Sequence, residues 1–388
     1  MGCCFDVIVV GAGAMGMNAG YRLAERGLSV LLLDACDPPH SLGSHHGETR
    51  LLRHAYRDAC SVPLALRAHR LWSEMEEETG GPLFRQTGVL NLAAADSSVQ
   101  LEKAVMAERF GLRTELLGPA DIERRWPGFS VPDGYTGLYE PTAGVLFSEA
   151  CMLAARRLAA ASGAVLLPYT PVNDITVEPS GVTVKTPNGC FHGTQLVLTT
   201  GSWSALMLDP LRLPVAAVRQ TVAWFEAEEE KYGEAVFPGF TFDLPDGDFY
   251  GVPSIGGSGV KIGRHDAGRE FEPSAVPEPF GAQPSDEEEL RRFAAVRLPG
   301  AAGRLVGSAV CRYERTPDEQ FLIDRHPVHG HVWIATGFSG HGFKFASAVG
   351  EAVAELVATG RSSFDLSAFS LGRFAGFAPS SAEIPPGA

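Results

Sequence analysis

The chain contains seven cysteines, and one of them lies in a segment where a thiol could do chemistry. None of the seven forms a pair with the spacing of a disulfide framework or a zinc site, and we predict no metal. Cys311 lies in GSAVCRYERTPDEQFLID (307–324), after small residues and before Arg312 and Tyr313. Such a cysteine is either a small core hydrophobe or a nucleophile whose pKa a nearby cation lowers. Other segments decide between the two.

A glycine-rich turn near the N-terminus predicts a nucleotide site. DVIVVGAGAMG (6–16) places Gly11, Gly13 and Gly16 in G-x-G-x-x-G spacing after a β-branched strand. The glycines allow a tight turn, close approach of pyrophosphate and close helix packing, and a helix over about 14–26 directs its positive end at the phosphates. The next strand ends at Asp34, the offset of a carboxylate that binds ribose hydroxyls. This pattern favours FAD or NAD over NADP.

A cluster of cationic and imidazole side chains follows the second strand. The segment DPPHSLGSHHGETRLLRHAY (37–56) contains His45, His46, Arg50, Arg53 and His54, and we expect a long basic loop that runs into a short helix. In an acidic protein such a cluster should face an anion, either the pyrophosphate or a substrate carboxylate. A plain NAD domain would continue with another helix and strand, so this segment favours FAD.

Two later segments have the form of a strand followed by glycine. GTQLVLTTGSWSALML (193–208) ends its strand just before Gly201. HVWIATGFSGHGFKFASAVGEAVAELVATG (331–360) combines a strand, a turn with Gly337, Gly340 and Gly342, and a long helix headed by Lys344. Open backbone amides and a helix N-terminus can bind a flavin ring. Glycine turns at both ends of the chain predict one extended cofactor.

Length and charge limit the classes of function. The 388 residues suffice for two domains, and the net charge of −14 disfavours nucleic acid and anionic membranes as partners. No apolar run approaches the roughly 18 residues of a membrane span, and the N-terminus is not typical of a signal peptide. Together with the unpaired cysteines, this predicts a cytoplasmic protein.

These motifs together resemble the monomeric sarcosine oxidase family, whose relatives include N-methyltryptophan oxidase and pipecolate oxidase. The resemblance rests on the segments at 6–16, 37–56, 307–327 and 335–351 and on TAGVLFSE (142–149), and it extends from about Phe5 to Phe369. It implies FAD attached through a thioether from Cys311 to the flavin 8α carbon. It also implies a small amino acid and O2 as the partners of a monomer.

The resemblance further implies roles for individual residues. Arg53 and Lys344 match the pair that holds the substrate carboxylate, and Lys261 matches the lysine that activates oxygen near flavin N5. Arg50 matches an arginine beside the flavin. Tyr250 and His265 match two pocket residues that face the amine. Tyr313 matches a tyrosine beside the flavin ring, and Val172 matches the adenine contact. With these we group His45 as a cofactor residue.

The strand pattern supports a flavin-facing Lys261. In GVKIGRH (259–265) alternation places Lys261 and His265 on one face and Val260 and Ile262 on the other. The alternative is a solvated lysine on the outer face of the sheet. Two positions depart from the family: Thr241 stands where close relatives carry a methionine in the pocket wall, and Arg264 stands where an aromatic residue is common. These departures leave the preferred N-alkyl group or side chain open.

We expect an α/β (α+β) fold in which two domains interleave. A Rossmann-like FAD domain takes 1–85, 144–215 and 305–388, and a substrate domain built on a mainly antiparallel sheet takes 86–143 and 216–304. Ser148 is predicted to cap one helix, and Ser285 with Glu288 to form a capping box at another.

The favoured function is oxidation of sarcosine, or a close N-methyl amino acid, at the carbon beside nitrogen. A hydride equivalent would pass to the flavin, O2 would become hydrogen peroxide, and hydrolysis would give glycine and formaldehyde. One alternative is an oxidase of a bulkier or cyclic amine such as N-methyltryptophan, pipecolate or proline. The other is a flavin dehydrogenase or a non-catalytic FAD-binding protein, which the presence of Lys261 disfavours.

Overall fold

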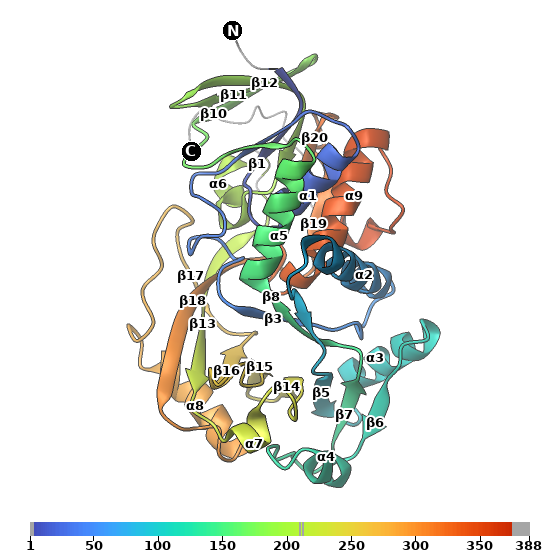
Figure 1. Cartoon of the computed structure of the whole chain (residues 1–388), viewed down its shortest axis with the longest axis vertical. Coiled ribbons are helices and arrows are strands. Elements are labelled where there is room, and N and C mark those ends of the chain that lie inside the picture. The colour runs from blue at the N-terminus through green and yellow to red at the C-terminus, as the bar shows by residue number, and fades with distance from the viewer. Residues whose placement is uncertain (1–3, 209–210, 212, 375–388) are drawn as a thin grey trace.

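A largely parallel sheet forms the upper half of the molecule (Figure 1). The computed structural model describes residues 4–208, 211 and 213–374. Strands β1 and β2 pair in parallel. β12 pairs in parallel with β1 and with β20, and β9 pairs in parallel with β2. Strands β10, β11 and β19 are antiparallel to their neighbours. The bounds are β1 Cys4–Val10, β2 Val30–Leu33, β9 Val165–Leu167, β10 Asp174–Glu178, β11 Gly181–Thr186, β12 Gly189–Leu198, β19 Leu322–Arg325 and β20 Val332–Thr336.

Helices pack against this sheet around one large apolar core. The helices are α1 (Ala14–Glu25), α2 (Ser61–Thr79), α5 (Ser148–Ala161) and α9 (Ala346–Thr359). The predicted first helix is confirmed within one residue, and it ends because Gly27 takes a left-handed backbone at φ +84°. A side chain at Gly16 would lie 1.9 Å from the carbonyl oxygen of Gly11, so that glycine is required for close packing.

A second, mainly antiparallel sheet forms the lower half of the molecule in Figure 1. Its pairs are antiparallel except β14 with β5. The bounds are β5 Val89–Ala94, β6 Glu115–Leu117, β7 Tyr135–Glu140, β13 Ala216–Phe225, β14 Gly239–Leu244, β15 Gly247–Val252, β16 Val260–Arg264, β17 Arg269–Glu270 and β18 Leu305–Arg315. The predicted α/β (α+β) fold with two kinds of sheet is therefore confirmed.

The strand that carries Cys311 belongs to this second sheet. β18 pairs with β13 along most of its length, and Cys311 lies opposite Gln220. The sheet thus continues past the domain boundary that we place at residue 305. The division into two domains stays a prediction, and residues 1–3, 209–210, 212 and 375–388 of its ranges lie outside the described residues.

The basic segment after β2 does not run into a short helix, as we had expected. It forms a loop and then strand β3 (Thr49–Leu52), which joins β8 (Gly144–Phe147) and β4 (Phe84–Arg85) in a small antiparallel sheet. The nineteen-residue helix α2 begins only at Ser61. All four residues of β3 pair with β8, so a partner that is distant in the chain makes this segment a strand.

Four more helices cover the second sheet: α3 (Ser98–Arg109), α4 (Pro119–Arg125), α7 (Glu229–Tyr232) and α8 (Ser285–Arg297). The two predicted serine caps are wrong. Ser148 is the first residue of α5 and its hydroxyl donates to the carbonyl oxygen of Gly47, while α8 is preceded by Pro284 and has no side-chain cap.

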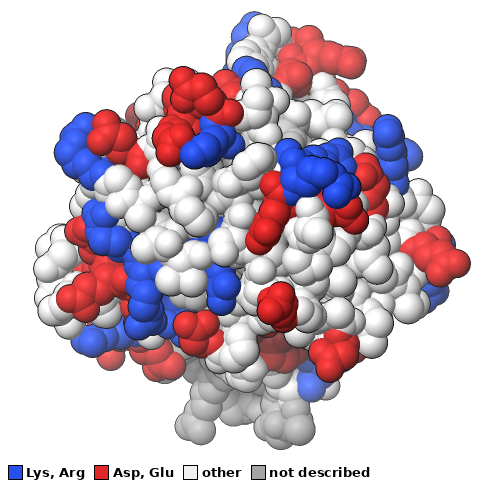
Figure 2. Space-filling model, turned by 90° about the horizontal axis from the view of Figure 1, so that it is seen from below, with Lys and Arg blue, Asp and Glu red and all other residues white. Residues whose placement is uncertain are grey.

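The surface carries charges of both signs. On the face shown in Figure 2, cationic and anionic side chains are interspersed, and neither sign covers it alone. Within the described residues, no helix is long and apolar enough to cross a membrane.

Candidate functional site

One elongated cavity of about 760 Å³ connects the two sheets and collects most of the predicted site residues. It runs from the glycine turn after β1 to the segment between β20 and α9. All the residues with a predicted catalytic, substrate or cofactor role line it except two: Gly16, which packs inside the first turn, and Gly337, which backs onto Thr316. The residues that line it are Gly11, Gly13, Asp34, His45, Arg50, Arg53, Val172, Gly201, Thr241, Tyr250, Lys261, His265, Cys311, Tyr313, Gly340, Gly342 and Lys344.

The nucleotide end is shaped by the first turn and the end of β2. Gly11 has φ +89°, and a side chain there would meet the carbonyl oxygen of Thr199 at 2.5 Å. Asp34 Oδ2 accepts a hydrogen bond from the backbone N–H of Ala12 at 2.8 Å, so the carboxylate fixes the turn as well as facing the cavity. His45 is buried beside Gly13, and burial lowers its pKa to about 3. A neutral ring therefore borders this end.

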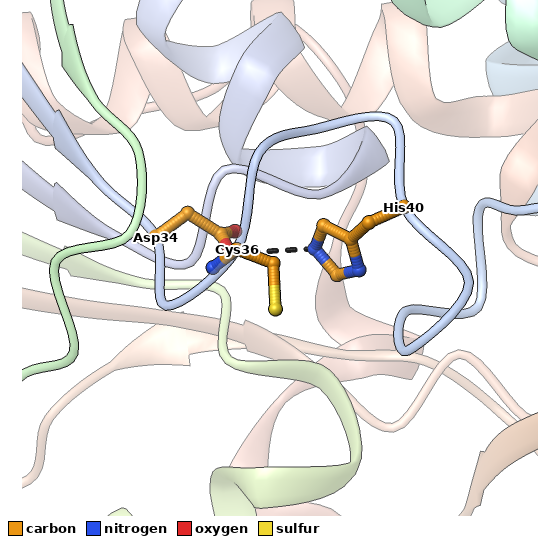
Figure 3. Close-up of side chains that lie close together, drawn as sticks. All are labelled: Asp34, Cys36 and His40. Atoms are coloured by element: carbon orange, nitrogen blue, oxygen red, sulfur yellow. Dashed lines mark hydrogen bonds and ion pairs between the residues drawn. The ribbon is translucent and has the colours of Figure 1, made fainter.

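Asp34 also belongs to a cluster with Cys36 and His40 (Figure 3). One potential ligand atom from each lies within 4.8 Å of the others, and His40 Nε2 is 3.3 Å from Asp34 Oδ1. Carboxylate, thiol and imidazole are ligands of divalent metals. However, the cluster borders the nucleotide end of the cavity, and Asp34 is the expected ribose ligand. The prediction of a metal-free protein stays a prediction.

The cavity has the features that FAD requires. Buried polar atoms of Tyr56, Ser202 and His341 have no hydrogen-bond partner among the described residues, and all three residues line the cavity. Buried polar groups are normally paired, so these atoms call for a ligand. At the far end, a side chain at Gly340 would lie 2.0 Å from the Tyr313 ring, which leaves backbone as the lining there. The residues present therefore fit a long, polar, planar cofactor.

Two cations meet around one aromatic ring at the other end. The Arg53 guanidinium lies 4.5 Å from the centroid of the Tyr56 ring, and Lys344 Nζ lies 5.8 Å from the same centroid. Arg53 donates to the carbonyl oxygen of Ala55 and Lys344 to that of His341. Neither has an ion-pair partner among the described residues. Burial and then Arg53 lower the pKa of Lys344 well below its usual value, so a bound anion would relieve an unfavourable arrangement.

Lys261 and Arg50 converge on a single carbonyl group. Lys261 Nζ donates to the Thr49 oxygen at 2.9 Å, and Arg50 Nη1 donates to the same oxygen at 2.8 Å. Lys261 is 4% exposed, so it is not the solvated surface lysine of the alternative interpretation. Burial and then Arg50 lower its pKa to about 7. Cys311, which acts to raise that pKa, also lines the cavity.

The walls between these cations are aromatic and mostly neutral. Burial raises the pKa of Tyr250 well above its usual value and that of Tyr313 to about 12, so both phenols keep their protons. His265 lies 5.7 Å from the Tyr313 ring, and burial, followed by Lys344, lowers its pKa to about 4. An uncharged imidazole and two phenols therefore surround the space beside the cation pair.

Two members of the expected cation cluster lie elsewhere. His46 and His54 do not line the cavity. His54 Nε2 is 3.0 Å from His69 Nδ1, and its backbone N–H donates to buried Glu140. The expectation that the whole cluster faces an anion is therefore wrong for these two. Both residues lie outside β3, His46 in the loop before it and His54 in the segment after it, so they do not share the positions of Arg50 and Arg53 at the cavity.

Sequence reasoning missed a polar chain behind the pocket wall. Thr241 Oγ1 donates to Asn91 Oδ1 at 3.1 Å, and Asn91 Nδ2 donates to Glu140 Oε1 at 2.9 Å. Glu140 Oε2 accepts backbone N–H groups of His54 and Ala55, next to Arg53. The wall residue Thr241 is thus linked to the backbone that carries Arg53. No local pattern in the sequence signals these contacts, which join strands distant in the chain.

Two other cavity residues, Glu314 and Lys103, were also missed. Glu314 is buried and accepts hydrogen bonds from Thr336 Oγ1 at 2.7 Å and from the Gly337 N–H at 3.1 Å. It therefore supports the glycine turn from behind. No local pattern in the sequence singles it out, because β18 also contains Arg312 and Arg315. Lys103 lies on α3, where helical spacing from Val99 places both on the cavity face.

Comparisons with known proteins agree with this geometry. Residues 6–356 match the family described as DAO, FAD dependent oxidoreductase. The chain is 47% identical to a monomeric sarcosine oxidase of Bacillus sp. (strain B-0618) over 95% of this chain and 96% of that protein. It is 41% identical to an N-methyl-L-tryptophan oxidase of Salmonella newport (strain SL254) over 95% of this chain and 99% of that protein.

Solved structures share the fold at lower sequence identity. An L-proline dehydrogenase from P. horikoshii has a TM-score of 0.84 at 24% identity, covering 95% of this chain and 97% of that one. A glycine oxidase from Geobacillus kaustophilus has a TM-score of 0.80 at 24% identity, covering 96% of this chain and 100% of that one.

Proposed function

The chain belongs to the DAO family of FAD-dependent oxidoreductases, and from this premise we propose that it oxidises sarcosine or a related N-methyl amino acid with O2. It is a flavin-dependent amine oxidase. With sarcosine the balanced reaction consumes one O2 and one water and yields glycine, formaldehyde and hydrogen peroxide. When bound, FAD supplies the two-electron acceptor that O2 restores.

The observation that supports an amino acid substrate is the cation pair at Tyr56. Arg53 and Lys344 lie at 4.5 and 5.8 Å from one ring centroid, are buried or partly buried, and have no ion-pair partner among the described residues. A carboxylate between them would take a charge-assisted hydrogen bond from each. Such a clamp orients the substrate so that its amine points away from the cations.

The amine would lie among Tyr250, His265 and Tyr313. A secondary amine must lose its ammonium proton before the adjacent carbon can be oxidised. His265 is neutral above about pH 4, so it can accept a hydrogen bond or a proton without adding positive charge. The two protonated phenols exclude water and can donate to the carboxylate or the amine.

We further propose that Cys311 carries FAD through a thioether. Cys311 lines the cavity, and the cations Arg50 and Lys261 lie in the same region. Cys311 is only half-buried, and it belongs to none of the apolar clusters formed by the described residues. This observation favours the nucleophile over the core hydrophobe among the two interpretations of Cys311.

Lys261 is proposed as the residue that promotes the reaction with O2. One-electron transfer to O2 creates superoxide, and a fixed cation beside it stabilises that charge. Lys261 is held by the Thr49 carbonyl, so its ammonium is positioned before the reaction begins. A dehydrogenase that passes electrons to a carrier would have no use for this arrangement.

Net charge and the relatives support the remaining proposals. With a net charge of −14, the chain is not expected to bind nucleic acid or membranes. We propose a cytoplasmic monomer, in keeping with a relative named as a monomeric oxidase.

The test compares sarcosine with N-methylpropylamine, which lacks the carboxylate. Hydrogen peroxide should form rapidly with sarcosine or another N-methyl amino acid and slowly, if at all, with the amine. N-methyl-L-tryptophan, pipecolate and proline complete the panel, because the resemblance implies that Thr241 replaces a methionine in the pocket wall. Equal turnover of sarcosine and N-methylpropylamine would contradict the proposed carboxylate clamp.

A further inference from the structure

A third lysine faces the cavity, and the proposed reaction does not use it. Lys103 lies on α3, one turn after Val99, and both line the cavity. It is only 9% exposed, and its ammonium makes no hydrogen bond or ion pair with any described residue. Its neighbour Glu102 instead pairs with Arg57 at 2.6 Å on the surface. The side chain is thus buried except where it meets the cavity, and an anion bound there could pair with its ammonium.

The electrostatics of Lys103 agree with this geometry. Burial, and then Arg53, lower its pKa to about 7, although the carboxylates of Glu140, Asp243 and Asp248 act in the opposite direction. Arg53 also lowers the pKa of Lys344, so Arg53 is within electrostatic reach of both lysines. The cavity therefore continues from the proposed carboxylate clamp to a second cationic group.

The wall of this extension is polar. β14 and β15 place Thr241 opposite Tyr250 and Asp243 opposite Asp248, and all four residues line the cavity. The Thr241 hydroxyl proton is used by Asn91, so its oxygen offers only lone pairs to the cavity. A long apolar side chain would leave these groups without partners.

We propose that Lys103 is a specificity-determining residue that binds an oxygen acceptor, preferably a carboxylate, on the side chain of the substrate. The substrate class is then an N-methyl amino acid with an acidic side chain, such as N-methyl-L-aspartate or N-methyl-L-glutamate. The α-carboxylate would lie at Arg53 and Lys344, and the side chain would extend toward α3. This inference rests on the proposed function and narrows its substrate.

Asp243 and Asp248 provide the opposing consideration. Burial, followed by Asp243, raises the pKa of Asp248 to about 6, so carboxylates of the wall repel one another. They would favour a cationic side chain. However, both are only half-buried, whereas Lys103 is buried, so the ammonium has lost more hydration and gains more from a partner. N-methyl-L-lysine is therefore the substrate that separates the two interpretations.

The experiment measures kcat/KM for sarcosine, N-methyl-L-alanine, N-methyl-L-aspartate, N-methyl-L-glutamate and N-methyl-L-lysine. In the wild type, kcat/KM for one of the two acidic substrates should exceed kcat/KM for N-methyl-L-alanine. In Lys103→Met, the ratio of kcat/KM for that acidic substrate to that for sarcosine should fall on the order of 10–100-fold, the usual effect of a charged hydrogen bond. Lys103→Arg keeps the charge and is the matched control, and Lys103→Gln is a second neutral variant.

Equilibrium binding gives a readout independent of turnover. Calorimetric titrations compare the binding of succinate, glutarate and acetate to the protein. Succinate and glutarate should bind the wild type more tightly than acetate does, and Lys103→Met should remove that preference. The role of Lys103 is refuted if sarcosine is oxidised but neither acidic substrate has a higher kcat/KM than N-methyl-L-alanine. It is also refuted if N-methyl-L-lysine has a higher kcat/KM than the acidic substrates. If no N-methyl amino acid is oxidised, the proposed function itself fails.

Discussion

Glu314 makes a quantitative prediction about stability and pH. Its carboxylate is 7% exposed, and it accepts hydrogen bonds from Thr336 and Gly337 at the turn between β20 and α9. Burial raises its pKa from the ordinary value of 4.5 to about 7. The folded state therefore holds this proton over a range of pH in which the unfolded chain has released it.

The sign and size of the effect follow from proton linkage. Because the pKa in the folded state is raised, the contribution of Glu314 is fully present below pH 4.5 and is lost as the pH rises through about 7. A shift of about 2.5 units corresponds to about 3 kcal/mol, since each unit is worth about 1.4 kcal/mol. Glu314→Gln removes the titration, so its free energy of unfolding should lack this pH-dependent loss.

Urea denaturation at two pH values tests the prediction. Between about pH 4.5 and about pH 8, the free energy of unfolding of the wild type should fall by about 3 kcal/mol relative to that of Glu314→Gln. Glu270→Gln removes an exposed carboxylate of β17 and is the matched control. A difference that does not change with pH would refute the buried, protonated Glu314.

Three further predictions concern the proposed roles in the cavity. After denaturation in acid the yellow colour should stay with the wild-type chain and leave Cys311→Ser, and colour that separates from the wild type would contradict the thioether. Lys261→Met should slow the reaction with O2 on the order of 10²–10³-fold while substrate still reduces the protein anaerobically; stopped-flow reoxidation at the wild-type rate would exclude Lys261 as the oxygen site. Arg53→Met and Lys344→Met should each cost on the order of 2–5 kcal/mol of carboxylate binding, and unchanged sarcosine KM and kcat/KM in either would remove that residue from the clamp.

The local features of the fold could be predicted because they depend on neighbours in the chain. The Gly11 to Gly16 turn, its flanking strand and helix, and the place of Asp34 at the end of the second strand follow from spacing and backbone conformation. The strand within 259–265 follows from its alternation, and it lies in the mainly antiparallel sheet that we expected for the substrate domain. The buried Lys261 also follows, because His265 shares its face.

The remaining features depend on partners that are distant in sequence. The segment after β2 becomes strand β3 because β8, about ninety residues later, offers it an edge. His54 is drawn to Glu140 and His69 instead of the cavity. Ser148 gives its hydroxyl to Gly47, a contact that no capping pattern contains. Lys103 faces the cavity only because α3 packs against β5 and β7, and nothing near it in the sequence indicates a site.

Anaerobic mixing with sarcosine tests the central claim most directly, that this cavity binds an N-methyl amino acid and oxidises it with bound FAD. The yellow absorption of the holoprotein should bleach on mixing. It should return when O2 is admitted, with one hydrogen peroxide and one formaldehyde formed for each sarcosine consumed. If neither sarcosine nor any other N-methyl amino acid bleaches the protein, the account of the site given by Arg53, Lys344 and His265 is wrong.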